Sequence, residues 1–158
     1  MAITSAHRDH VASDVHTSLR VPADLSVVSF VRSAMACMLT RLEWPAGGSA
    51  RVLLASTEAL TNAIEHGSRP GATVRVDLTI TPDRADVVVI DQGRAGIAEI
   101  PQVPSVAPPA TATRGRGLII MSRLADEFDL RPCGEGTEVS VVFSRALDHD
   151  HPRVPAAG

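Results

Sequence analysis

The fold is decided by the stretch Glu58-Ala59-Leu60-Thr61-Asn62-Ala63-Ile64-Glu65-His66-Gly67. On a helix from Arg51 to His66, at about 100° per residue, one apolar stripe should face the core. The stripe contains Leu53, Thr57, Leu60, Ala63 and Ile64. Glu58 and Asn62 fall nearly opposite it, and their i, i+4 spacing makes them neighbours. Gly67 stands where a C-cap glycine would end the helix. The same pattern is typical of the solvated side of an ordinary helix, so its meaning depends on the rest of the chain.

Composition indicates one globular domain. The chain has 158 residues, of which 44% are hydrophobic, and a mean hydropathy of +0.11, which fits a single core. A formal charge of −3 and an aromatic content of 3% provide neither a basic surface nor many rings for base stacking, so we expect no direct nucleic acid partner. Cys37 and Cys133 show no paired spacing. No apolar run is long enough for a signal peptide or a membrane span, so we expect a cytoplasmic protein without membrane contact.

The rest of the chain predicts strands and helices around the central helix. Hydrophobic patterning predicts strands at 15–21, 73–81, 85–90, 127–130 and 138–143, and helices at 24–42 and 118–125. Asp24 is expected to N-cap the first of these helices, and the stretch from Trp44 to Gly48 to break it. This order predicts an α+β two-layer sandwich, with helices on one face of a mixed, mostly antiparallel sheet. We expect one domain at 14–146, between a flexible arm at 1–13 and a flexible tail at 147–158.

Residues 94–113 differ from the segments on either side. Four prolines stand among Ala, Val, Ser and Thr without any usable period. A loop of this length inside a compact domain is usually functional or disordered. We therefore expect a lid at about 94–114 that closes over a ligand.

Three separated motifs suggest that the ligand is a nucleotide. They are Glu58 with Asn62 on the central helix, Asp91-Gln92-Gly93 followed by Gly96 after a strand, and Arg114-Gly115-Arg116-Gly117-Leu118 at the start of a helix. Glycines before a helix N-terminus form a phosphate site. Mg²⁺ needs only one or two protein oxygens, which Asn62 can supply, and Glu58 can act as a general base. A carboxylate at a strand end, Asp91, can accept a hydrogen bond from the adenine amine.

In this combination the sequence resembles the Bergerat-fold ATPases, and most of all the small bacterial anti-sigma factor serine kinases. The resemblance covers about residues 15–145. It implies ATP and Mg²⁺ as ligands, with Glu58 as catalytic base and Asn62 as the metal ligand. It also implies adenine recognition by Asp91 and Gly93, and a phosphate cradle of Gly115 and Gly117 with charge from Arg116. Arg114, Leu118 and Gly96 belong to the same boxes, and Thr137, after Gly136, fits a late motif that supports the adenine site.

One position departs from the family pattern. The first glycine box usually has a second glycine two residues after the first, but here that position is Ala95, and Gly96 follows one residue later. The departure affects the expected backbone path at the hinge of the lid. It does not affect the expected contact of Asp91 with adenine.

The resemblance implies an ATP-dependent serine/threonine protein kinase that inhibits a sigma factor and phosphorylates a STAS-type anti-anti-sigma protein. The helix at 24–42 has more apolar surface than one sheet contact needs, so we expect part of it to serve a homodimer or the sigma partner. Two alternatives stay open: a non-catalytic adapter that uses ATP only to set its shape, and an ATPase with an unrelated protein substrate.

Overall fold

The computed structural model describes residues 14–93, 116–134 and 136–145. The predicted arm, lid and tail lie outside these residues. Within them, no helix is long and apolar enough to cross a membrane.

The sheet has five strands in the order β1-β2-β3-β5-β4, and every pairing between the described strands is antiparallel. The strands are β1 Val15–Pro22, β2 Thr73–Ile80, β3 Arg84–Ile90, β4 Glu127–Cys133 and β5 Gly136–Ser144. The predicted sheet was mostly antiparallel but mixed, so the observed one is the more regular. β4 is longer than predicted because it is an edge strand, where Pro132 can be accommodated without breaking an inner ladder.

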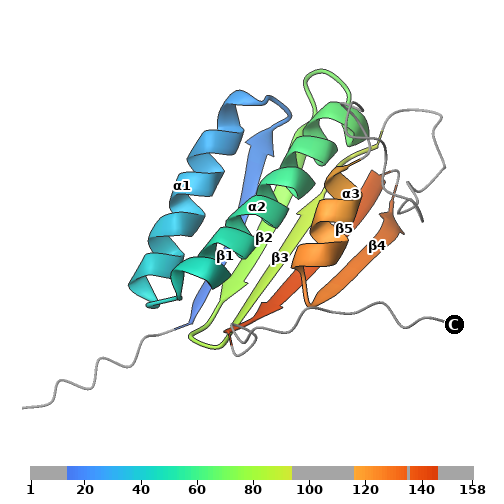
Figure 1. Ribbon diagram of the computed structural model, residues 1–158. Helices are drawn as coiled ribbons and strands as arrows, with labels where there is room; N and C mark the ends of the chain where they lie inside the picture. The colour runs from blue at the N-terminus through green and yellow to red at the C-terminus, as the bar shows by residue number, and fades with distance from the viewer. Residues whose placement is uncertain (1–13, 94–115, 135, 146–158) are drawn as a thin grey trace, which may run out of the picture.

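Three helices lie side by side on one face of the sheet, with α2 between α1 and α3 (Figure 1). They are α1 Ser26–Arg41, α2 Ala46–Asn62 and α3 Gly117–Leu124. A π-helical turn, Ala63–Gly67, continues α2. This arrangement confirms the predicted α+β two-layer sandwich.

The start of α1 differs from the prediction. The helix begins at Ser26, and the residue before it, Leu25, already has helical dihedral angles (φ −61°, ψ −21°). Asp24 lies one residue further out, where its Oδ1 accepts a hydrogen bond from the backbone N–H of Ser26 at 2.7 Å. Asp24 thus stabilises the entry to α1 without standing at its N-cap.

α2 begins five residues before the predicted start at Arg51. Pro45 stands at the N-cap in an extended conformation, and the expected break, Gly47 and Gly48, forms the first turn of α2. Gly48 lies beneath the buried indole of Trp44, because a methyl group built on Gly48 would be 3.3 Å from the ring. The stretch therefore ends α1 and also begins α2.

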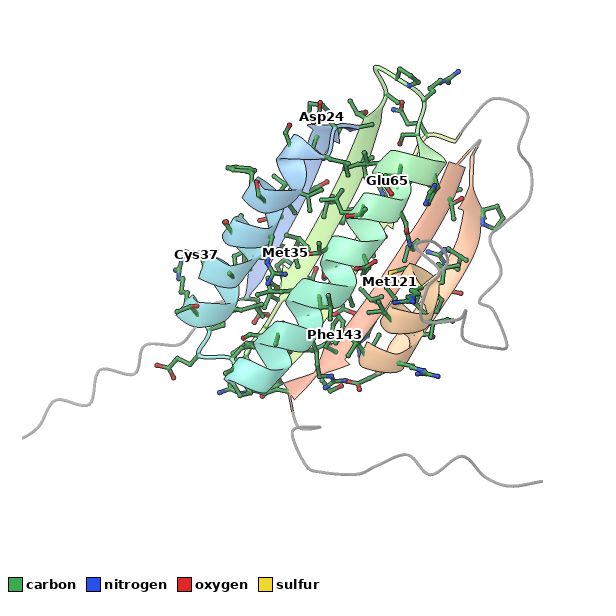
Figure 2. The ribbon with its side chains drawn as sticks, turned by 45° about the horizontal axis from the view of Figure 1, so that its top comes forward. Asp24, Met35, Cys37, Glu65, Met121 and Phe143 are labelled. Carbon is green, nitrogen blue, oxygen red and sulfur yellow. The ribbon has the colours of Figure 1, made fainter. Side chains whose placement is uncertain are left out.

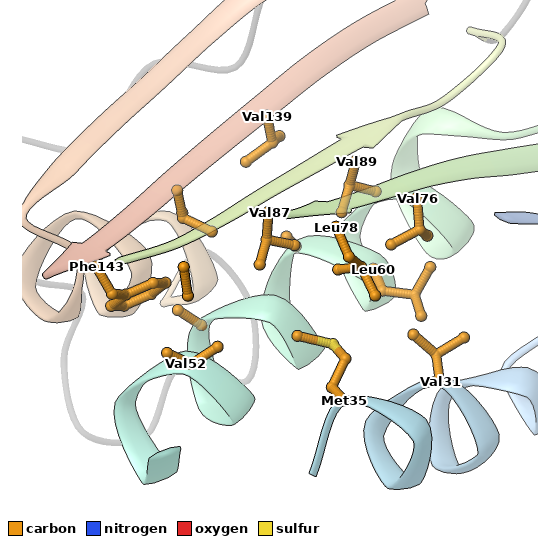
Figure 3. Packing of buried hydrophobic residues seen from close by; sticks show 14 of the residues in the cluster. Val31, Met35, Val52, Leu60, Val76, Leu78, Val87, Val89, Val139 and Phe143 are labelled. Carbon is orange, nitrogen blue, oxygen red and sulfur yellow. The ribbon is translucent and has the colours of Figure 1, made fainter. Parts of the chain in front are cut away.

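The core lies between the sheet and the three helices. Figure 3 shows Val31 and Met35 of α1, Val52 and Leu60 of α2 and the inward valines of β2, β3 and β5 gathered in one cluster. The predicted stripe of α2 was partly wrong. Leu60, Ala63 and Ile64 are buried, but Leu53 and Thr57 are half-buried, and the rest of the buried face comes from Val52, Ala55, Ser56 and Ala59. The face is shifted and broadened because α2 packs on the sheet and on both neighbouring helices.

Candidate functional site

The first part of the site forms where the C-terminal half of α2 meets the start of α3. A methyl group built on Gly117 would lie 2.8 Å from Asn62 Nδ2, 3.0 Å from Glu58 Oε2 and 3.2 Å from Asn62 Oδ1. Glu58 and Asn62 are half-buried, so they do not form the solvated side of an ordinary helix. They face the N-terminus of α3, where backbone N–H groups lack helical acceptors. Because glycine has no side chain, both polar groups can lie close to those N–H groups; a larger residue would push the Asn62 and Glu58 side chains away.

The second part of the site is the carboxylate of Asp91, directly after β3. The residue is buried, with an exposed fraction of only 6%. Oδ1 accepts hydrogen bonds from the backbone N–H of Gly93 at 2.8 Å and of Thr137 at 3.0 Å. Gly93 has a φ of +74°, a conformation that favours glycine. Removal from water raises the pKa of the Asp91 carboxyl, and the two backbone hydrogen bonds act in the opposite direction.

Two further glycines surround Asp91. A methyl group on Gly67 would lie 2.1 Å from Asp91 Oδ2, and one on Gly136 would lie 2.2 Å from the Asp91 backbone oxygen and 2.6 Å from Oδ1. Gly67 was expected as a helix cap, but it is not among the glycines with a positive φ. Its function in the fold is to make room for the carboxylate. Because Gly67 is five residues from Asn62 and ends the π-helical turn, that turn connects the two parts of the site; such turns are frequent at functional sites.

The structure thus groups the predicted residues into two sets. Glu58, Asn62 and Gly117 meet at the start of α3, and Asp91, Gly93 and Thr137 meet at the end of β3. Thr137 contributes its backbone, not its hydroxyl, to Asp91.

Arg116 and Leu118 stand on either side of Gly117. Arg116 is exposed just before α3, whereas Leu118 is half-buried and packs against the core. Gly96, Arg114 and Gly115 lie outside the described residues.

Sequence reasoning missed Gly67 and Gly136 as site residues. Both stood in quoted motifs, but a glycine that makes room for a distant side chain cannot be distinguished by pattern from one that ends a helix or enters a strand. Their contact with Asp91 is between residues 24 and 45 positions apart. Only the fold brings them together.

A Gly67→Ala substitution should lower the free energy of unfolding by about 1–3 kcal/mol, because the methyl group would overlap the Asp91 carboxylate. The measurement is chemical denaturation. Gly71→Ala is the control: its φ of +79° strains a side chain although no atom lies within 4 Å of the added methyl group, so its effect on stability should be the same with and without Asp91. In an Asp91→Ala background, Gly67→Ala should lower the free energy of unfolding much less. An equal loss of unfolding free energy with and without the Asp91 side chain would mean that Gly67 does not accommodate the carboxylate.

Comparisons with known proteins identify the family. The sequence model of the family described as "Histidine kinase-like ATPase domain" matches residues 21–143. The chain is 28% identical over 135 residues to the anti-sigma F factor of Clostridium beijerinckii, covering 82% of this chain and 94% of that protein. It is 27% identical over 141 residues to the serine-protein kinase RsbW of Bacillus velezensis, covering 84% and 86%. RsbW of Bacillus subtilis is 25% identical over 148 residues, covering 85% and 91%.

A solved structure supports the fold. The crystal structure of the RsbU and RsbW domains of a Mycobacterium tuberculosis protein superimposes with a TM-score of 0.58 at 18% sequence identity. The match covers 82% of this chain and 31% of that one. At this identity the likeness concerns the arrangement of the strands and helices.

Proposed function

Because the chain belongs to the histidine kinase-like ATPase domain family, we propose that it is an ATP-dependent serine/threonine protein kinase that also binds and inhibits a sigma factor. Its protein substrate is a STAS-type anti-anti-sigma protein. Relatives of similar length, named anti-sigma F factor and serine-protein kinase, support this proposal. ATP binding follows from the family itself. The kinase activity and the two protein partners are the finer part of the proposal.

The observation that carries the proposal is the contact of Gly117 with Glu58 and Asn62. The first N–H groups of α3, which have no acceptor within the helix, suit phosphate oxygens. No group of three or more His, Cys, Asp or Glu side chains in the described ranges could hold a metal by itself. Mg²⁺ does not need such a group, because it keeps several waters and takes few protein oxygens. Asn62 Oδ1 beside the phosphate position fits this demand, and the bound ion would neutralise charge on the phosphates.

Adenine recognition is assigned to Asp91. Gly93 and Thr137 hold Oδ1 by backbone hydrogen bonds, which leaves Oδ2 to accept from an exocyclic amine. An amine donor at this place distinguishes adenine from guanine, which presents a carbonyl oxygen there. Gly67 and Gly136 lie against the carboxylate, so its direction is set before a nucleotide binds.

Glu58 is assigned as the general base. Its carboxylate takes the proton of the attacking serine or threonine hydroxyl, whose oxygen forms the new bond to the γ-phosphorus. The bond from the γ-phosphorus to the β,γ-bridging oxygen breaks, and ADP leaves with that electron pair. The products are ADP and a phosphorylated hydroxyl, and the proton passes from Glu58 to solvent.

A homodimer is part of the proposal. Leu25 and Phe30 are 49% and 66% exposed on the entry and first turns of α1, although Val31, Met35 and Leu39 of the same helix are buried. Exposed apolar side chains mark a contact surface when they form one patch, and Leu25 and Phe30 are the residues at the start of α1 that would contribute to it. The molecular mass in solution, measured by light scattering at several concentrations, tests this assignment.

The proposal predicts nucleotide binding that depends on both parts of the site. ATP and ADP with Mg²⁺ should raise the melting temperature by mass action, and calorimetry should give affinities for each. Asn62→Ala should weaken ATP binding with Mg²⁺ present and have little effect without it. Thr61→Ala, a half-buried neighbour on α2, is the matched control. A wild-type chain that binds no ATP would remove the whole assignment.

Phosphoryl transfer is tested separately, with labelled ATP and STAS proteins from the same genome. The expected product is one labelled STAS protein, phosphorylated on serine or threonine. Nucleotide binding without any labelled product would favour the adapter alternative.

A further inference from the structure

A second contact joins α2 to α3 at the end of α3 that is far from the site. Arg51 of α2 donates hydrogen bonds from Nε and Nη2 to the backbone oxygen of Leu124, at 3.0 and 2.6 Å. Leu124 is the last residue of α3, so its carbonyl is one of those that lack a partner within the helix. A cation at this end also interacts favourably with the helix dipole.

Asp126 extends this contact into the sheet. Arg51 Nη2 also donates to Asp126 Oδ1 at 2.8 Å, and the side chains of Arg51 and Asp126 are 27% and 12% exposed. Asp126 Oδ2 accepts from the backbone N–H of Ser144 at 2.7 Å. The guanidinium carbon of Arg51 lies 5.8 Å from the ring centre of Phe143, which Figure 2 shows near α2 and α3. The C-terminal end of α3 is therefore fixed to α2 and to β5 at once.

The same line of α2 carries the site. Glu58 and Asn62 follow Arg51 by seven and eleven residues, which is close to two and three full turns at about 3.6 residues per turn. α3 runs antiparallel to α2, because Leu124 meets Arg51 and Gly117 meets Glu58. Leu124 is seven residues from Gly117, as Glu58 is from Arg51, and both helical spans are about 10 Å at about 1.5 Å per residue. The two contacts therefore fix the two ends of α3 against one stripe of α2.

α3 needs such external support. It has eight residues, and isolated helices shorter than about 12–15 residues are marginal in water. Met121 is its one fully buried side chain among the described residues, and it holds the middle of α3 against the core. Leu118 and Leu124, near the two ends of α3, are only half-buried against the core. Without a further contact these ends could shift, and this would move the N–H groups at Gly117 relative to Asn62.

We propose that Arg51 is a positioning residue for phosphate binding: by fixing the C-terminal end of α3 it sets where the N-terminal end lies relative to Glu58 and Asn62. This inference rests on the proposed function for its ligand and on the contacts of Arg51 for its geometry. Arg51 does not touch the reacting atoms, and its effect passes through α3.

An Arg51→Met variant tests the inference, because it keeps an unbranched side chain beside Phe143 and removes the charge and the donors. Its affinity for ATP should fall by about tenfold, within the usual range of coupling between sites, and KM for ATP should rise with it. The affinity of this variant for adenosine should not change, because adenosine lacks phosphates and Asp91 recognises its base. A general loss of structure would weaken both ligands, so this difference separates positioning from stability. Amide hydrogen exchange of α3 should also become faster while α2 stays protected.

Arg145→Met is the matched control. Arg145 also donates to backbone carbonyls, those of Leu42, Glu43 and Pro82, but these belong to the α1–α2 connection and the β2–β3 turn. Its loss should lower the melting temperature without changing the ratio of ATP affinity to adenosine affinity. Arg51→Lys should restore ATP affinity only in part, because one ammonium group replaces a planar fork of donors.

Equal ATP affinity in Arg51→Met and wild type, with unchanged exchange in α3, would overturn the inference. If Arg51→Met does not fold, Arg51→Lys is compared with wild type by the same measurements, and a normal ATP-to-adenosine ratio with normal exchange has the same meaning. A wild-type chain that binds neither ligand would remove the proposed function. The exchange of α3 would then still decide whether Arg51 holds the helix.

Discussion

A Glu58→Gln variant should transfer phosphate about 10²–10⁴-fold more slowly than the wild type, the usual loss when a general base is removed. Its affinity for ATP should remain close to that of the wild type. Glutamine has the shape of glutamate, so the close contact with Gly117 is kept and only the capacity to accept a proton is lost. The measurement is single-turnover transfer to the STAS substrate, together with calorimetry of ATP binding to the same preparation.

Glu65→Gln is the control for this substitution. Glu65 lies in the π-helical turn three residues after Asn62, and its side chain is 46% exposed. The Glu65→Gln variant should transfer phosphate at the wild-type rate. If Glu58→Gln loses ATP affinity in proportion to its rate, Glu58 acts in binding and the general-base assignment is wrong. If both variants match the wild type, another group accepts the proton.

The central helix shows how far local sequence patterns reach. The prediction that Glu58 and Asn62 are neighbours on one side of a helix was correct, because it depends only on the geometry of that helix. Their surroundings were not correctly predicted. Periodicity assigns one apolar face to a helix, whereas α2 packs against the sheet, α1 and α3, so that Glu58 and Asn62 face Gly117 instead of open solvent.

The glycines and prolines show the same limit. Proline and glycine are typical of a break between helices. Pro45, however, is the N-cap of α2, and Gly48 lies in the first turn of α2 beneath the ring of Trp44. Proline is also typical of a strand end, but Pro132 lies on the edge strand β4, which continues past it. In each case the deciding contact comes from packing between elements. The three motifs could be recognised because each is local, whereas the approach of Gly117 to Glu58 and Asn62 depends on the fold.

Asp91→Asn is expected to weaken ATP binding by about 10–100-fold, the equivalent of losing a hydrogen bond to a charged group. The two backbone N–H groups of Gly93 and Thr137 require an acceptor at Oδ1, and in asparagine only the carbonyl oxygen can serve. The amide NH₂ must then take the position of Oδ2. A donor would meet the adenine amine, which is also a donor, so the preference for ATP over GTP should be lost as well. Calorimetry with both nucleotides measures the two effects.

Stability against pH shows whether this loss has a structural origin. Burial raises the pKa of the Asp91 carboxyl above its ordinary 3.8, so the folded state binds this proton more tightly than the unfolded state does. The contribution of Asp91 to the free energy of unfolding is therefore greatest at low pH. It decreases as the pH rises from the ordinary pKa through the raised one, and it stays constant above that. Asp91→Asn has no such proton, so its stability should lack this decrease and should not be lower than that of the wild type at neutral pH. A variant that loses ATP and also unfolds more easily at neutral pH would show that Asp91 maintains the fold, and its assignment to adenine would then have no support from the binding measurement.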